Sequence, residues 1–509
     1  MDKTSSAELS EAINSQWQWF KGAVVCYVYL EDVDCEPDDR AGVFVRLEQC
    51  RWLTRGWTLQ ELIAPTHAVF FDARWRRIGT KIGLSHDLER ITGVPSSLLQ
   101  GNRDSHTPTD YSVAERMSWA ANRRTTRPED MAYCLLGVFD VHMPILYGEG
   151  GPRAFRRLQR KILKSTNDQS LLAWTDLRED RGAPAVGGVF ADSPAAFTGT
   201  LWEGASILAG DSGGSIFKQR MDHSNIGLTA WMPLIESLSE RVVFAALNCQ
   251  IQHEGEPRSN PWMVLWRTGS GSFLRINLLR GMLNPSQIMS PALPLPPAEM
   301  VCVEDRPGTR HTQAPGDWEL GRSVGILLAF PAGKQAFKKV ASFPPPDDED
   351  DEASAVGIFR LCRTAEDYYH GILAFEDSTT TTRMPPKRLC LFFARSKNYG
   401  KRDANGKWCW TCRVLPSVNV SLGELRDVSV SELGKICPED GLFRAPVQET
   451  SLWRGVDQLG STVVRIDHHS PVVHGTERGA LNIASVVFDH PGGIDDVSPL
   501  SFLARELAV

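Results

Sequence analysis

A continuous apolar run near the start of the chain constrains its fold most strongly. Residues Ala23 to Leu30 read AVVCYVYL, in which β-branched and aromatic residues follow one another without a charged position. Strands that are buried on both faces have this pattern, and such strands are typical of parallel sheets covered by helices. The run therefore predicts a helix-flanked, parallel sheet.

The neighbouring segments favour the same arrangement. A helix is predicted over residues 5–20, where a capping-box pair precedes apolar residues at helical spacing. Trp57–Leu62 reads as a short helix, and Ala68–Phe71 reads as a second buried strand. The order helix, strand, helix, strand indicates a doubly wound α/β sheet. Because two strands are too few for a stable open sheet, further strands are expected upstream of Met1.

From residue 85 to residue 165 the signals turn helical. The clearest predicted helix start is Thr126, which forms a second capping box with Glu129. Leu135 belongs to the apolar stripe that follows. These signals predict a helical extension over residues 85–178.

A further helix is predicted over residues 153–164, with a strongly basic polar face. Its cationic residues recur at helical spacing and share one face: Arg153, Arg156, Arg157, Arg160, Lys161 and Lys164. Such a face suits docking of an anionic partner, whether a lipid, a nucleotide or an acidic protein surface. The simpler interpretation, which we favour, is the solvated side of an amphipathic helix.

Beyond about residue 179 the sequence changes to short β-rich runs. The clearest are VVFAALNCQI from Val242, PWMVLWRT from Pro261, SVGILLAF from Ser323, RLCLFFA from Arg388 and TVVRI from Thr462. They predict a large β-rich, sandwich-like domain over residues 179–509. Linkers are expected near residues 285–300 and 343–354, because prolines and like charges there disfavour packing.

Bulk composition excludes several classes of protein. Apolar residues make up 42% and charged residues 23% of the chain, which disfavours wholesale disorder and coiled coil. No apolar run reaches the ~18–20 residues of a membrane span, so no transmembrane segment is predicted. Eleven scattered cysteines suit reduced thiols, and a cytoplasmic location is expected. The net charge of −7 predicts no DNA partner.

Three motifs that superficially suggest sites are better explained as structure. The run YGEGG from Tyr147 lacks the spacing of phosphate-binding loops and predicts a turn before the basic helix. Cys409 and Cys412 form a lone pair in a strand-like setting, and His468 and His469 are similarly isolated. No metal and no bound cofactor are therefore predicted.

Long motif runs in the first third of the chain resemble heterokaryon-incompatibility (HET) domain proteins of filamentous fungi. The runs are DKTSSAELSEAIN from Asp2, CYVYLEDV from Cys26, RWLTRGWTLQELIAP from Arg51 and RMSWAANRRTTRPEDMAYCLLGVFDVHMPILYGEG from Arg116. The family's first strands are absent before Met1. The resemblance therefore implies a HET domain over residues 1–84 that is truncated at its N-terminus and has a partial TIR-like, flavodoxin-like fold.

This resemblance also implies a function. HET proteins are associated with vegetative incompatibility, in which fusion of unlike hyphae triggers programmed cell death. Self/non-self recognition is therefore expected, mainly through protein interaction. The implied partners are other incompatibility or signalling proteins, with self-association as a further expectation.

HET domains are considered relatives of TIR domains, some of which cleave NAD+. The run Trp57–Leu62 resembles the W-x-L-x-E-L signature of TIR proteins, in which Glu61 is the matching carboxylate. The resemblance implies an alternative function, with NAD+ as substrate and Glu61 stabilising the developing oxocarbenium-like charge. Arg51, Arg55 and Trp57 are then candidates for substrate or phosphate binding. The simpler interpretation, which we favour, is a packed helix with surface salt bridges.

Overall fold

The computed structural model divides the chain into two compact units, which are described separately. Unit 1 comprises Met1–Leu234, Arg241–Ser286 and Pro291–Glu319, and unit 2 comprises Ile235–Glu240, Gln287–Ser290 and Leu320–Val509. The structure describes residues 6–34, 40–101, 107–175, 186–197, 205–209, 221–237, 241–253, 258, 260–276 and 295–305, and nine strands between residues 324 and 489. The predicted linker residues 285–294 and 344–354 lie outside this described part.

Helices dominate the first 175 residues of unit 1. They are α1 (Ser6–Gly22), α2 (Arg40–Glu48), α3 (Arg51–Thr54), α4 (Thr58–Ile63), α5 (Ser85–Thr92), α6 (Ser96–Leu99), α7 (Val113–Ser118), α8 (Asp130–Tyr133) and α9 (Gly151–Ser165). Short 3-10 helices follow at Pro108–Asp110, Gln169–Leu172 and Pro194–Phe197. The helices predicted at residues 5–20, 57–62 and 153–164 are confirmed as α1, α4 and α9. Within the described residues, no helix has both the length and the apolar character that membrane crossing requires.

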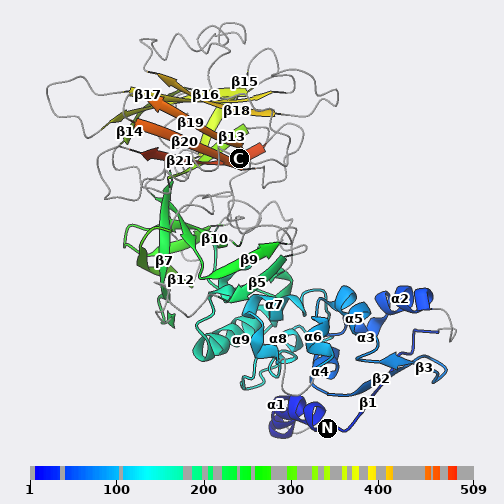
Figure 1. The fold of residues 1–509 in the computed structure, drawn as a ribbon. Coiled ribbons are helices and arrows are strands. Elements are labelled where there is room, and N and C mark those ends of the chain that lie inside the picture. The colour runs from blue at the N-terminus through cyan, green and yellow to red at the C-terminus, as the bar shows by residue number, and fades with distance from the viewer. Residues whose placement is uncertain are drawn as a thin grey trace, which may run out of the picture. The chain divides into compact units, whose positions relative to one another are not determined.

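A three-stranded sheet lies beside α2 to α6 (Figure 1). Its central strand β2 (Ala68–Phe71) is parallel to β1 (Cys26–Tyr29) and antiparallel to β3 (Arg77–Thr80). Val28 and Phe70 are buried on one face, and the ring of Trp52 packs edge-on against Phe70 with centroids 5.7 Å apart.

The other face of this sheet corrects a prediction. The run from Ala23 to Leu30 was expected to be covered on both sides, but Tyr27 is 68% exposed. Alternate side chains of a strand point to opposite faces, and the burial alternates along β1. On the exposed face, Tyr29 stacks on Trp75 with ring centroids 4.7 Å apart. The prediction of two covered faces is therefore wrong for β1 in the described part of the chain.

The helix predicted to begin at Thr126 is also corrected, because α8 begins only at Asp130 and is four residues long. Instead of closing a capping box, the Glu129 carboxylate accepts hydrogen bonds from the backbone N–H groups of Gly148, at 2.9 Å, and Gly150, at 3.1 Å. Both glycines have positive φ. This contact fixes the turn that was predicted before α9, and Gly150 directly precedes that helix.

The rest of unit 1 consists mainly of strands, which belong to several pairings. They are β4 (Val186–Gly187), β5 (Ala205–Ala209), β6 (Asp222–His223), β7 (Gly227–Ser237), β8 (Val242–Ala246), β9 (Cys249–His253), β10 (Trp262–Arg267), β11 (Phe273–Ile276) and β12 (Ala298–Glu304). The last three residues of β7, 235–237, belong to unit 2. β10 pairs antiparallel with β8 and β11, whereas β7 pairs with β6 and β12. One hydrophobic cluster extends from Ile13 on α1 to Val303 on β12, so helices and strands of unit 1 share a core.

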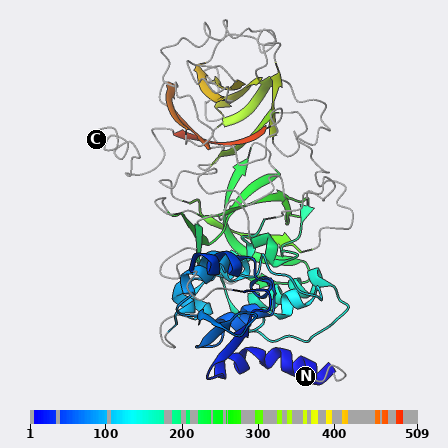
Figure 2. The same ribbon diagram turned by 90° about the vertical axis from the view of Figure 1, so that its right-hand side faces the viewer.

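In unit 2 the structure describes strands, which appear as curved ribbons in Figure 2. They are β13 (Val324–Phe330), β14 (Phe337–Phe343), β15 (Ile358–Arg363), β16 (Tyr369–Asp377), β17 (Arg388–Ser396), β18 (Cys409–Pro416), β19 (Trp453–Leu459), β20 (Thr462–His469) and β21 (Ala480–Asp489). β16, β17 and β18 form an antiparallel series, and β13 is parallel to β21. The strands predicted from Ser323, Arg388 and Thr462 are confirmed as β13, β17 and β20, and the sandwich architecture stays a prediction.

Candidate functional site

Glu61, the predicted catalytic carboxylate, lies half-buried on α4 between the buried residues Gln60 and Leu62. Burial raises the pKa of the Glu61 carboxyl, because removing a charge from water disfavours ionisation. A hydrogen bond from the Trp52 side chain and the positive charges of Arg55 and Arg123 act in the opposite direction. The charges of two guanidinium groups therefore act on the carboxyl, which keeps a raised pKa.

Arg123 was not predicted as part of this neighbourhood. Its buried guanidinium donates from Nη1 to the carbonyl of Arg55 at 2.9 Å and to Thr58 Oγ1 at 3.1 Å, and Nε donates to the carbonyl of Trp119 at 3.1 Å. Burial lowers its pKa to about 10. Arg123 thus ties α4 to the segment after α7. The sequence RRTTR contains three arginines, and nothing in their spacing tells which of them is buried.

Two of the residues predicted to assist Glu61 have other partners in the structure. The Arg51 side chain is 70% exposed and pairs with Glu31 at 2.5 Å and with Asp32 at 3.4 Å. Trp57 donates its indole N–H to Asp130 Oδ2 at 3.2 Å. Of the three predicted substrate-binding residues, Arg55 is the one whose charge acts on Glu61.

Lys81, which follows β3, is a second charged group that the sequence did not single out. It is 3% exposed, and its ammonium donates to the carbonyls of Pro65 and, at 3.3 Å, of Ile63 at the end of α4. Burial lowers its pKa to about 8. Burial also raises the pKa of the Cys26 thiol, and the Glu61 charge adds to that effect. The charges of Glu61 and Lys81 therefore both act on the Cys26 thiol at the start of β1.

The side chains around Glu61 offer few groups that can take part in a reaction. A carboxyl with a raised pKa can donate or accept a proton, and two adjacent guanidinium groups can stabilise negative charge. Most donors around it are already used by backbone carbonyls. Among the described residues, no set of three or more histidine, cysteine or acidic side chains is placed to hold a metal ion.

The basic face of α9 is partly neutralised within the chain. Arg156 pairs with Asp192 at 2.6 Å. Arg157 pairs with Glu149, and Arg160 pairs with Asp305 at 2.5 Å. In the described part of the chain, the ion pairs of α9 are confined to these three arginines. The remaining cations of the predicted face are Arg153, Lys161 and Lys164.

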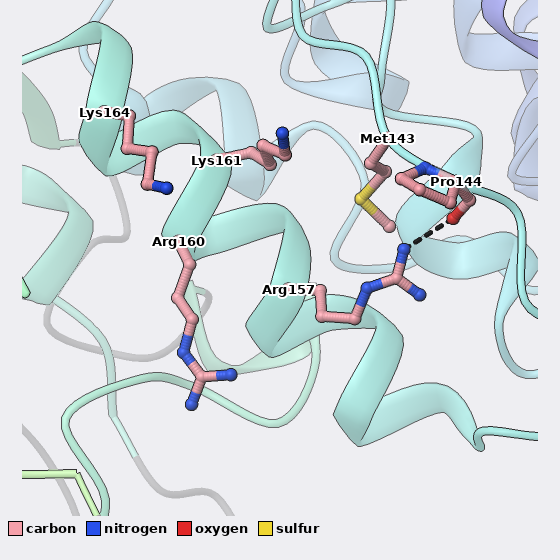
Figure 3. Close-up of a pocket in the computed structure, with 6 residues that line it drawn as sticks. All are labelled: Met143, Pro144, Arg157, Arg160, Lys161 and Lys164. Atoms are coloured by element: carbon pink, nitrogen blue, oxygen red, sulfur yellow. Dashed lines mark hydrogen bonds between the residues drawn. The ribbon is translucent and has the colours of Figure 1, made fainter. Parts of the chain in front are cut away.

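Four of these cations line a recess, which we call the α9 groove. Its volume is about 170 Å³, and its lining residues are Met143, Pro144, Arg157, Arg160, Lys161 and Lys164. Figure 3 shows Lys161 extending towards Met143 and Arg157 extending towards Pro144, whose carbonyl accepts a hydrogen bond from Arg157 Nη2 at 2.5 Å. Met143 and Pro144 were not predicted, because they come from a loop before α9 with no functional signal.

Two partly buried carboxylates, whose side chains are 14% and 7% exposed, hold the arginines of the groove in place. Glu149 accepts hydrogen bonds from Arg157 and, at 2.9 Å, from the Tyr133 hydroxyl. Asp305 contacts Arg160 and lies 3.0 Å from His223 Nε2. Burial acts to raise the pKa of Asp305, but the hydrogen bonds from His223 and Arg160 outweigh burial and lower this pKa. The groove therefore has two fixed arginines and two lysines without an acidic partner in the described residues.

Comparison with known proteins gives two matches. A family model described as a domain of unknown function (DUF8212) matches residues 153–195, which include most of α9. The vegetative incompatibility protein HET-E-1 of Podospora anserina is 46% identical over 198 residues, which is 38% of this chain but only 14% of the length of HET-E-1. No solved structure gives a significant match. The similarity to HET-E-1 confirms the resemblance of this chain to fungal HET-type incompatibility proteins.

Proposed function

We propose that this chain acts in vegetative incompatibility, as a self/non-self recognition and cell-death signalling protein of the cytoplasm. The observation that carries the proposal is the 46% identity with a vegetative incompatibility protein over 198 residues. The chain spans 14% of the length of that relative, so its partners and its output are part of the proposal. The eleven cysteines of the sequence are scattered without framework spacing, which suits a reducing compartment.

In this proposal the protein acts mainly through protein interaction. The contacts around Glu61 support this choice, because the predicted substrate-binding residues have structural partners. Arg51 pairs with Glu31, and Trp57 donates to Asp130. A side chain that already has a partner in the chain has fewer donors left for a substrate.

Fusion of living hyphae tests the proposal. We expect that a fungal strain given this chain forms fusion cells with an untransformed strain that die more often than fusions within either strain. The measurement is the fraction of fusion cells that take up a vital dye. Gly137→Leu is a matched control, since a Cβ at this position would lie 2.4 Å from Trp17 Cβ and displace α1. Equal death in all fusions would contradict a role in self/non-self recognition.

The second candidate function is TIR-like cleavage of NAD+ with Glu61 as the catalytic carboxylate. It is favoured by one specific observation, which is a half-buried carboxyl with a raised pKa beside Arg55 and Arg123. Incubation of the purified protein with NAD+ and detection of nicotinamide separates the two candidates. The interaction proposal predicts no release above the blank.

Two variants make this assay specific. Glu61→Gln removes the candidate carboxylate while keeping its shape. Glu115→Gln is the matched control, because burial also raises the pKa of the half-buried Glu115, to about 7, elsewhere in unit 1. Nicotinamide release that is lost in Glu61→Gln and kept in Glu115→Gln would replace the interaction proposal by the enzymatic one.

A further inference from the structure

The α9 groove carries more positive than negative charge. Of its four cations, Arg157 pairs with Glu149 and Arg160 pairs with Asp305. Lys161 and Lys164 form no ion pair within the described residues, and both are exposed. The lining therefore has an excess of about two positive charges. A single carboxylate group would compensate half of it, whereas a phosphate monoester has a charge of about −1.5 to −2 at pH 7.

The shape of the groove limits the kind of ligand. A recess of about 170 Å³ is smaller than the roughly 300 Å³ at which pockets for whole drug-sized ligands begin. It therefore suits one end of a small molecule. Lys161 and Lys164 are three residues apart on α9, and side chains at this spacing have Cβ atoms about 5–6 Å apart. Their ammonium groups lie at the ends of long side chains on the same face of the helix and can both reach one phosphate group or a diphosphate.

The groove is also built in advance of binding. Phe155, Leu158 and Ile162 of α9 are buried in the core of unit 1, which fixes the position of the helix. Glu149 and Pro144 hold the Arg157 guanidinium from two sides. The helix and the two arginines therefore lose little conformational entropy on binding, and the entropic cost of ordering falls on Lys161 and Lys164.

One hydrogen-bond donor in the lining is unused. The Nε atom of Arg160 is buried and has no hydrogen-bond partner among the described residues. Buried donors are nearly always paired in folded proteins. Buried donors of Trp119 and Arg123, outside the groove, are unpaired as well, so the charge excess and the size of the groove carry the inference.

We propose that the α9 groove binds the phosphate end of a small phosphorylated molecule. Lys161 and Lys164 supply the compensating charge, and Met143 and Pro144 contact the adjoining apolar part of the ligand. This site is separate from Glu61 and does not depend on the proposed role in incompatibility. A small molecule bound in this way would act as a signal to which the chain responds.

Calorimetric titration of the full chain with inorganic pyrophosphate tests the proposal. The variant Lys161→Gln/Lys164→Gln removes the two uncompensated charges, and we expect it to bind at least about tenfold more weakly, as loss of hydrogen bonds to a charged group predicts. The control variant Lys21→Gln/Arg153→Gln removes the same charge from exposed positions outside the groove. We expect binding by the control to change less than about twofold.

Other results would overturn the proposal. Equal weakening in both double variants would mean that only the overall charge matters. If sulfate binds as tightly as pyrophosphate at matched ionic strength, the groove binds anions in general and has no preference for phosphate. Binding to vesicles that contain phosphoinositides, without binding of free pyrophosphate, would assign the face to a membrane surface. The melting temperature of each unliganded variant is measured in parallel, and pyrophosphate should raise it for the wild type and for the control variant only.

Discussion

The Glu61 neighbourhood and the α9 groove are built from similar charged residues, but their charges have different surroundings. Arg123 and Lys81 are buried, and backbone carbonyls accept most of their hydrogen bonds. Lys161 and Lys164 are exposed and have no acidic partner in the described part of the chain. Buried charges with internal partners hold elements together, whereas uncompensated surface charge is available to a ligand. The difference suggests a scaffold around Glu61 and a binding site along α9.

The largest effect is expected at Arg123. Arg123→Ala removes hydrogen bonds to the carbonyls of Arg55 and Trp119 and to Thr58 Oγ1, and it leaves a gap in the core. We expect the free energy of unfolding to fall by about 2–4 kcal/mol, measured by chemical denaturation. Arg124→Ala, at an exposed neighbouring position, should change it by less than about 0.5 kcal/mol. Equal effects at both positions would contradict a scaffold role for Arg123.

A smaller loss is expected at the anchored end of the groove. Glu149→Gln weakens the contacts with both Tyr133 and Arg157, so the free energy of unfolding should fall by about 1–2 kcal/mol. Asp192→Asn breaks the more exposed pair with Arg156 and should cost about 0–1 kcal/mol. Denaturation curves of the two variants provide the comparison. A larger effect for Asp192→Asn would show that Glu149 does not anchor the groove.

The pH dependence of stability tests the burial of Glu61. A carboxyl whose folded-state pKa is raised is protonated more in the folded than in the unfolded protein, so its contribution to stability falls as pH rises from 4.5 through the raised pKa. The Glu61→Gln variant has no ionisable group at this position, so its stability does not fall with rising pH for this reason. Relative to the wild type, the variant should therefore gain stability between pH 4.5 and pH 7. A difference that stays constant over this range, in denaturation at several pH values, would contradict the raised pKa.

The smallest effect is expected for the uncompensated lysines. Without ligand, Lys161→Gln/Lys164→Gln should change the free energy of unfolding by less than about 0.5 kcal/mol, because neither side chain has an ion pair to lose among the described residues. Thermal or chemical denaturation provides the measurement. A clear destabilisation would show that these lysines are structural, and the contrast with Arg123 would disappear.

Local sequence patterns predicted several elements well. The alternation of apolar and basic residues predicted α9, because helical periodicity decides which side chains share a face. The apolar run Ala68–Phe71 predicted β2 with the same bounds. A local motif gave a wrong prediction where groups further along the chain bind one of its side chains. Thr126 and Glu129 have capping-box spacing, but the Glu129 carboxylate binds the backbone of Gly148 and Gly150, which lie about twenty residues further on.

The sequence by itself determined where α1, β1, α4 and β2 lie and which α9 residues are cationic, whereas α2, α3 and β3 were not predicted. The tertiary structure decided which of these charged side chains are exposed and without an acidic partner among the described residues, and hence available to a ligand. Arg123 and Arg124 are adjacent and chemically identical, yet one is buried and the other exposed. Likewise, Arg160 is compensated by Asp305, 145 residues away, whereas Lys161 beside it is not. Burial and ion pairing between distant residues depend on which segments pack against one another. Neither the residue type nor the local spacing specifies which segments these are.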